Sequence, residues 1–389
     1  MKQVYLDNQS NTQMDDIVFN SMVPYMKQYY GNPQSIYSLG QISKDAIEQA
    51  RLSVSKLINS KPEEVIFTSC GSESNNLAIL GYVYANRHYG NHIITTKIEH
   101  PSVLNVIKHL ENNGYKVSYL DVDKNGLINL NEFENLITEN TLLVSIMFVN
   151  NEIGTIEKIS EISKIIKKKN KHIAFHVDAV QGFGKLKIDV KDLGIDMMST
   201  SAHKIHAAKG VGFLYKNKNI KINNILFGGG QQNNLRSGTL NTAGIVGFAK
   251  FANIIYNDFD IYNDKIKELK KYFVEKINEI NKFLDCIIIN SYDEDVFIPH
   301  IVSLSIKNVR AEVLIHSLEE KNIYVSAGSA CSSKQKKMSN TLIAIGLNKE
   351  LIDNTIRVSF SIYNEIFEID YFVDILKELI KNLQKYTRR

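Results

Sequence analysis

The sequence predicts an α/β protein, with a large domain built on a mostly parallel β-sheet and a smaller α+β domain. From about residue 40 to 250, short apolar runs alternate with amphipathic segments, which is typical of a parallel sheet covered by helices on both faces. After about residue 255 this alternation ends. A chain of 389 residues, 44% of them hydrophobic, is long enough for two cores. We expect residues 16–255 to form the large domain, and residues 1–15 with 256–389 to form the small one.

The expected strands of the large domain are short runs rich in apolar and β-branched residues. They lie at 65–68, 92–96, 117–120, 142–147, 173–177 and 211–215. Between them, apolar residues recur at helical spacing; Ile42, Ile47, Val54 and Leu57, for example, belong to one stripe. Strands and helices that alternate in this way predict a doubly covered sheet.

The small domain is expected to begin with a long helix over about 260–282. Strand-like runs follow at 287–289, 301–306, 323–325 and 356–360, and a final helix ends near Tyr386. The sequence contains no internal repeat or low-complexity linker.

Composition argues against several classes of protein. The formal net charge is only +4 and the lysines are scattered, so direct binding to nucleic acid is not expected. The N-terminus lacks the apolar core of a signal peptide, and no apolar run is long enough to span a bilayer. Three widely separated cysteines favour neither a disulfide framework nor a zinc cluster. We therefore expect a soluble cytoplasmic protein without a membrane segment.

The most informative motif is the segment from Asp196 to Lys204, in which a strand-like run leads directly into the pair His203-Lys204. Asp178 and Gln181 lie just upstream. Pyridoxal phosphate (PLP) needs a lysine to hold it as a Schiff base and a carboxylate beside its pyridine nitrogen. Lys204 and Asp178 provide these two groups, although a lone His-Lys pair is more often a solvated surface feature.

Further polar clusters follow other expected strands. Gly71 and Ser72 come after the run 65–68 and open an expected helix at 76–84, where serine caps and helix amides could hold a phosphate. Glu99-His100 follows the expected strand at 92–96, and Asn150-Asn151 follows the one at 142–147. Such residues are often structural when they occur singly, but open α/β sheets bind ligands at these strand ends. Together they predict a single crevice.

Cys331 differs from the other two cysteines because it lies in a Gly/Ser-rich segment, Gly328 to Ser333. Cys70 and Cys286 are flanked by strand residues and are expected to be buried. An accessible thiol in a loop is a candidate nucleophile, so Cys331 is the predicted reactive cysteine.

The run from Asp121 to Glu132 fits the calcium-loop pattern D-x-[DN]-x-[DN]-G-x5-E. An EF-hand also needs an entering helix, however, and residues 116–120 read as a strand. We expect instead an acidic turn with Gly126 at its bend, followed by a helix that starts near Asn129.

These residues, taken in order, resemble the cysteine desulfurases of the NifS/IscS group, PLP enzymes with the class V aminotransferase fold. The resemblance extends nearly from end to end of the chain. The matching segments are 4–8, 30–33, 67–69, 73–76, 96–100, 149–154, 176–179, 201–204, 228–231, 236–240, 328–331 and 356–359.

The resemblance implies a role for each of the following residues. Around the cofactor, these are Lys204 as the Schiff-base lysine, Asp178 at the pyridine nitrogen, Asn151 and Gln181 on the ring-hydroxyl side, and His100 stacked on the ring and assisting proton transfer. The phosphate would be held by Gly71, Ser72, Ser201 and His203, with Thr239 from the second subunit of a homodimer. Arg357 and Asn151 would bind the substrate, and Cys331 would be the nucleophile.

The implied activity is that of an L-cysteine desulfurase. Cys331 would take sulfur from L-cysteine as a persulfide and L-alanine would be released. The sulfur would serve iron–sulfur cluster assembly or RNA thiolation, with an iron–sulfur scaffold protein or another sulfur acceptor as partner. Other class V reactions, namely aminotransfer and selenocysteine lysis, are the second hypothesis, and a weakly active, PLP-binding relay or regulatory protein is the third.

The third hypothesis rests on departures from the family pattern. They lie at Gln9 to Thr12, at Cys70 to Ser72, at Ala207-Ala208 and at Ser361 to Tyr363.

Overall fold

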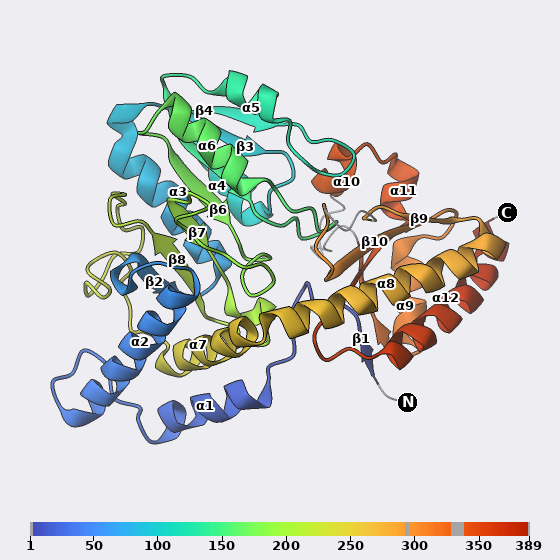
Figure 1. Ribbon diagram of the computed structural model, residues 1–389, viewed down its shortest axis with the longest axis horizontal. Helices are drawn as coiled ribbons and strands as arrows, with labels where there is room; N and C mark the ends of the chain where they lie inside the picture. The colour runs from blue at the N-terminus through green and yellow to red at the C-terminus, as the bar shows by residue number, and fades with distance from the viewer. Residues whose placement is uncertain (1–2, 292–295, 328–337, 388–389) are drawn as a thin grey trace.

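A computed structural model describes residues 3–291, 296–327 and 338–387 of the chain. Figure 1 shows a large sheet wrapped by helices on one side of the molecule and a smaller sheet with its own helices on the other. The long helix α8 (Phe259–Leu284) runs from the first part into the second (Figure 1). The sequence-based α/β prediction is confirmed.

Seven strands form the large sheet in the order β2-β8-β7-β6-β5-β3-β4. Only β8 runs against its neighbours, so the sheet is mostly parallel, as expected. In chain order, the strands are β2 (Val65–Thr68), β3 (His92–Thr96), β4 (Lys116–Leu120), β5 (Thr141–Met147), β6 (Ala174–Asp178), β7 (Met197–Ser199) and β8 (Gly212–Lys216).

Helices cover both faces of this sheet because alternate strand residues point to opposite sides. Ile93 packs with the helices α3 and α4, whereas its neighbour Ile94 belongs to the core on the other face. The first face carries α3 (Gly71–Asn86) and α4 (Pro101–Asn112). The second carries α2 (Ser38–Leu57), α5 (Leu130–Leu136), α6 (Ile159–Lys169) and α7 (Thr242–Asn257), with α1 (Asp16–Lys27) packed on α7.

The smaller sheet contains β9 (Ile287–Ile289), β10 (Ile301–Ile306), β12 (Ser326–Ala327) and β13 (Thr355–Ser359), all antiparallel. The N-terminal strand β1 (Val4–Tyr5) pairs with β11 (Ile323–Tyr324), so the N-terminal segment belongs to this part of the molecule. Around them lie α8, α9 (Ala311–Glu319), α10 (Asn340–Ala344), α11 (Lys349–Asp353) and α12 (Ile366–Thr387).

Most buried apolar residues cluster within one part, although Ile298 and Ile301 join the cluster of the first part and Ile153 clusters with residues of the second. The cluster of the second part joins Val4 and Leu6 to residues between 266 and 380. The apolar stripe of α8 explains the connection, since Ile266, Phe273 and Ile277 face this cluster. Val4 and Leu6 therefore pack with the last third of the chain.

The calcium-like run is the acidic turn that the sequence predicts. Gly126 has a φ of 82°, and Asp123 Oδ1 accepts hydrogen bonds from the backbone nitrogens of Asn125 (2.8 Å) and Leu127 (2.9 Å). Asn129 caps α5, and β4 precedes the turn in place of an EF-hand helix. Across the described residues, no group of three or more potential metal ligands is found.

The described part of the chain contains no helix that combines the length and the apolar character needed to cross a bilayer.

Candidate active site

A cavity of about 320 Å³ lies at one edge of the large sheet. Strands β2, β3, β5, β6 and β7 run in the same direction, so the residues that follow them meet at this edge. Ten of the twelve predicted site residues line the cavity: Gly71, Ser72, His100, Asn151, Asp178, Gln181, Ser201, His203, Lys204 and Arg357. The crevice inferred from the strand ends therefore exists.

Asp178 is the last residue of β6 and is buried at the base of the cavity. Its Oδ2 accepts a hydrogen bond from Asn75 Nδ2 at 2.7 Å, and its Oδ1 accepts one from the backbone nitrogen of Val180 at 3.0 Å. These two donors hold the carboxylate in one orientation.

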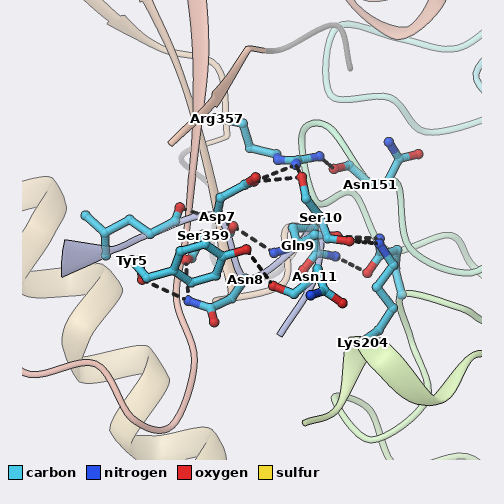
Figure 2. Close-up of polar contacts among 12 residues, drawn as sticks. Tyr5, Asp7, Asn8, Gln9, Ser10, Asn11, Asn151, Lys204, Arg357 and Ser359 are labelled. Atoms are coloured by element: carbon cyan, nitrogen blue, oxygen red, sulfur yellow. Dashed lines mark hydrogen bonds and ion pairs between the residues drawn. The ribbon is translucent and has the colours of Figure 1, made fainter. Parts of the chain in front are cut away.

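Lys204 ends a short 3-10 helix, Ala202–Lys204, that follows β7. Its Nζ donates to the backbone oxygens of Gln9 and Ser10, both at 2.7 Å, as Figure 2 shows. Burial and, to a smaller extent, the positive charge of Arg357 lower the pKa of this amine to about 8. A substantial fraction of the amine is therefore neutral, and nucleophilic, close to pH 8.

His100 caps the N-terminus of α4, where its Nδ1 accepts a hydrogen bond from the backbone nitrogen of Ser102 at 3.1 Å. The ring is exposed toward the cavity, yet desolvation by the surrounding protein lowers its pKa. Glu99, directly before it, joins the ends of β3 and β5, since its Oε1 accepts from Thr96 Oγ1 (2.8 Å) and from the backbone nitrogen of Met147 (2.9 Å).

The start of α3 differs from the expectation. The helix begins at Gly71, not at Asn76, and no serine caps it: Cys70 occupies the N-cap position without a side-chain hydrogen bond. The Ser74 hydroxyl contacts Thr68 Oγ1 (2.7 Å) and the backbone oxygen of Cys70 (3.3 Å) instead. The first amides of α3 consequently face the cavity without a side-chain cap.

Cys70 also corrects the sequence-based expectation. It is half-buried and lines the cavity, whereas Cys286 is buried as expected. The reason is its position in the turn between β2 and α3, where a residue belongs to neither apolar face.

Arg357 lies on β13 and reaches into the cavity from the second part of the molecule. Its guanidinium donates to Asp7 Oδ1 (2.9 Å), to Ser10 Oγ (2.7 Å) and to the backbone oxygen of Asn151 (2.7 Å), as drawn in Figure 2. Its Nε is buried and has no hydrogen-bond partner among the described residues. One donor of this buried cation thus has no acceptor among the described residues.

Two predicted site residues are not in this cavity. Thr239 is exposed and lines a different cavity of about 540 Å³, beside Gln231 and Arg51. Cys331 lies outside the described residues.

The structure adds residues that the sequence reasoning missed. Asp7 and Ser10 hold Arg357, while Gln9 and Lys185 lie behind Gln181. Lys185 is buried. The sequence around it contains two further lysines, so a surface position would be expected for all three. In the structure it follows the turn that begins at Asp178 and comes directly after Gly184, whose φ is 74°.

A family model described as Aminotransferase class-V matches residues 4–372, so the chain belongs to the class-V aminotransferase family. It is 42% identical over 386 residues to a protein named cysteine desulfurase IscS from Clostridium botulinum, covering 99% of this chain and 96% of that protein. A protein of the same name from Dictyoglomus turgidum is 39% identical, with 98% and 96% covered.

Solved structures are also similar to this chain over nearly its whole length. A NifS-like protein superposes with a TM-score of 0.92 at 36% identity, covering 98% of this chain and all of the other. The structure titled SspA in complex with cysteine has a TM-score of 0.81 at 33% identity, covering 94% of this chain and all of the other.

Pyridoxal phosphate is the cofactor of this family, and the residues present fit it. The hydroxyl of Ser201 is buried at the cavity without a hydrogen-bond partner among the described residues. At Gly71 a Cβ atom would lie 2.5 Å from Val180 Cγ2, so glycine keeps the start of α3 close to the turn after Asp178. An open helix terminus and a free hydroxyl suit a phosphate, and a buried carboxylate suits a protonated pyridine nitrogen.

Proposed function

We propose that the chain is an L-cysteine desulfurase that moves sulfur from L-cysteine to Cys331 and releases L-alanine. Relatives bearing the name cysteine desulfurase match it over almost its whole length. The observation that carries the proposal is that Lys204, Asp178 and Arg357, from different parts of the chain, line one cavity.

On the cofactor side, Lys204 would bind pyridoxal phosphate covalently and Asp178 would keep the pyridine nitrogen protonated. The bound cofactor supplies an electron sink for the bonds of the substrate amino acid. His100 would lie against the ring and assist proton transfer, and Asn151 and Gln181 would contact the side that carries the ring hydroxyl. The phosphate would be held by Gly71, Ser72, Ser201 and His203.

His203 would enter this site as a neutral imidazole. Burial lowers the pKa of its imidazole to about 4, and Lys204 adds to the effect. The ring is thus neutral near pH 7, and its Nδ1 is 3.0 Å from Asn11 Oδ1. A phosphate at this point would find hydrogen-bond donors of the helix and the hydroxyl of Ser201.

On the substrate side, Arg357 and Asn151 would bind the carboxylate of L-cysteine. The free Nε of Arg357 is one donor for it, and Asp7 Oδ1 would be a competing acceptor. Exchange of one carboxylate partner for another keeps the buried guanidinium compensated.

In the transfer step, the thiolate of Cys331 would attack the sulfur of L-cysteine. An S–S bond forms and the Cβ–S bond breaks, so that Cys331 carries a persulfide. The electron pair left on the carbon takes up a proton, and the product is L-alanine. A thiol or an acceptor protein then removes the terminal sulfur from the persulfide.

The proposal is tested by measuring L-alanine and sulfide released from L-cysteine in the presence of a thiol. We expect turnover by the wild type and none by Cys331→Ala, with the cofactor retained by both. Cys286→Ala, which removes a buried thiol outside the cavity, is the control. Full activity of Cys331→Ala would exclude the mechanism.

We further propose that the chain acts as a homodimer. Large apolar side chains are exposed on and near α1 and beside the cavity that contains Thr239, among them Met26 (56%), Ile36 (102%) and Phe227 (81%). A second copy over this region would cover them and bring Thr239 toward the partner's phosphate site. Sedimentation should show a dimer, and Ile36→Glu with Phe227→Glu should give monomers.

Three assignments complete the proposal: a large domain of residues 16–255 with a small one of 1–15 and 256–389, a cytoplasmic location, and delivery of sulfur to iron–sulfur clusters or thiolated RNA. The separate apolar cluster that joins Val4 to residues 266–380 supports the domain boundary. An iron–sulfur scaffold protein or another sulfur acceptor would be the partner. Incubation with ³⁵S-labelled L-cysteine, followed by capture of labelled proteins, tests the acceptor.

A further inference from the structure

Lys185 is a buried amine that contacts no carboxylate in the described part of the chain. It is 7% exposed, and its Nζ donates to Gln9 Oε1 at 2.8 Å and to Gln181 Oε1 at 3.2 Å. A lysine is seldom buried without an acidic partner, so its two amide partners need an explanation.

The two glutamines are themselves buried and bonded to each other. Gln9 is 1% exposed and Gln181 is 7% exposed. Gln9 Nε2 donates to Gln181 Oε1, and Gln181 Nε2 donates to the backbone oxygen of Gln9 at 3.3 Å. The side-chain oxygen of Gln181 therefore receives two donors, whereas its nitrogen uses one of its two hydrogens in the described structure.

We propose that Lys185, together with Gln9, is a positioning residue that fixes the side-chain amide of Gln181 with its nitrogen available to the ligand of the cavity. An amide can turn over and exchange its oxygen and nitrogen at almost no steric cost. Here a turned Gln181 amide would set its NH₂ group against the Lys185 amine and the Gln9 NH₂ group. Donors would then face donors in a buried place, so this orientation is disfavoured.

The protonation state of Lys185 decides whether Lys185 or Gln9 does more to oppose the turned amide. Burial lowers its pKa well below the usual value, and the charges of Lys204 and Arg357 lower it further. A neutral amine has two N–H donors, and Lys185 has two acceptors, the oxygens of Gln9 and Gln181. A protonated amine offers the same two bonds and has no lone pair, so it cannot accept a hydrogen bond from a turned amide. A neutral amine can accept one, and the Gln9 NH₂ group, which donates to Gln181 Oε1, then opposes the turn.

Gln181 lines the cavity, so its second N–H can donate to an acceptor there. This step rests on the proposed function, in which Gln181 faces the ring hydroxyl of the bound cofactor. A donor at that oxygen favours its ionised form and so lowers the proton affinity of the bound chromophore. Lys185 touches neither substrate nor cofactor and would act only through Gln181.

The test uses the PLP-loaded protein and a pH titration of its visible absorbance. Lys185→Met should raise the midpoint by about one pH unit, a tenfold change in proton affinity, because the Gln181 amide is free to turn. Gln181→Ala should raise it by a similar amount. The double variant Lys185→Met/Gln181→Ala should have the same midpoint as Gln181→Ala, because the two substitutions remove the same interaction with the cofactor.

A matched control is Lys187→Met. Lys187 lies two residues after Lys185 in the sequence, is exposed and pairs with Asp260. Loss of the Lys187 amine should therefore leave the midpoint of the titration unchanged. If Lys185→Met does not fold, Gln9→Met provides the second variant, because it removes one of the two donors to Gln181. It should shift the midpoint in the same direction by a smaller amount.

The proposal is overturned if Lys185→Met lowers the melting temperature but leaves the midpoint unchanged, or if its shift persists undiminished in the Gln181→Ala background. The proposed function fails in a different way, by the absence of sulfide release from a wild type that binds PLP. The titration needs no turnover, so the two failures are distinguishable.

Discussion

The two walls of the active-site cavity are held by different kinds of structure. On one wall, Asp178, Ser201 and Lys204 end or follow neighbouring strands of the large sheet. On the other, Arg357 is bonded to Asp7 and Ser10, which lie 350 and 347 residues away in the sequence. Backbone ladders place both walls, because Arg357 lies on β13, but the guanidinium of Arg357 is oriented by a few polar side chains. Single substitutions of polar residues should therefore disturb the positions of the side chains mainly on the second wall.

The largest effect is expected from Lys204→Ala on the first wall. Loss of the amine removes covalent attachment of the cofactor and a group that can move a proton, a loss of about 10²–10⁴ in kcat at least. L-Alanine formation and the visible band of the bound cofactor are the measurements. Lys209→Ala, an exposed lysine five residues on, is the control. Near-normal turnover by Lys204→Ala would contradict the proposal that Lys204, on the first wall, binds the cofactor.

On the second wall, Arg357→Gln should raise the KM for L-cysteine by about 10–100-fold, because a charge-assisted contact to the substrate carboxylate is lost. Cofactor absorbance should persist, since the sheet holds the first wall. Asp7, left without its partner, should also destabilise the variant, and adding Asp7→Asn should restore part of the melting temperature. A variant that loses the cofactor as readily as Lys204→Ala would show that the walls are not independent.

The two walls should nevertheless be coupled electrostatically, because the charge of Arg357 on the second wall lowers the pKa of Lys204 on the first. The pKa of Lys204 is lowered to about 8, and only the neutral amine attacks PLP. The rate of PLP uptake by the cofactor-free protein should therefore rise with pH and reach half its maximum near pH 8. Arg357 is the second cause of the lowered pKa, so Arg357→Gln should move this midpoint upward, toward the ordinary 10.5.

A stopped-flow record of the absorbance increase measures this uptake. Arg310→Gln, an exposed arginine paired with Glu312, should leave the midpoint in place. An equal midpoint in Arg357→Gln and in the wild type would mean that burial by itself lowers the pKa.

The same contrast explains how far the sequence could predict the site. Asp178, His100 and Lys204 follow recognisable strands, and parallel strands end at one edge, so their meeting in one crevice was predictable from local pattern. Asp7 and Lys185 could not be found in this way. Their roles depend on contacts between β1, β13 and the turn after β6, and periodicity carries no information on how distant segments pack.

Local rules also failed at the start of α3. Serines near a strand end predict a cap, but Gly71 is already helical, and Ser74 turns its hydroxyl to Thr68. The cap is absent where the helix amides face the cavity. Departures of this kind are expected where a site, rather than stability, determines the local structure.

The smallest predicted effect concerns Ser201, whose buried hydroxyl has no hydrogen-bond partner among the described residues. Ser201→Ala removes an unsatisfied group, so the cofactor-free protein should keep or slightly increase its melting temperature. Affinity for PLP should fall about tenfold, about 1.4 kcal/mol, because one hydrogen bond to the phosphate is lost. Differential scanning fluorimetry and a PLP titration give the two quantities.

Ser199→Ala is the matched control, two residues earlier and equally buried. Its hydroxyl is 3.0 Å from Nε2 of the buried His176, so the substitution leaves that nitrogen without this partner and should lower the melting temperature. The two serines should thus behave in opposite ways: Ser199 contributes to folding and Ser201 to the cofactor. If Ser201→Ala destabilises the cofactor-free protein as much as Ser199→Ala does, its hydroxyl is a structural group, and the phosphate must be held by the amides of α3 without it.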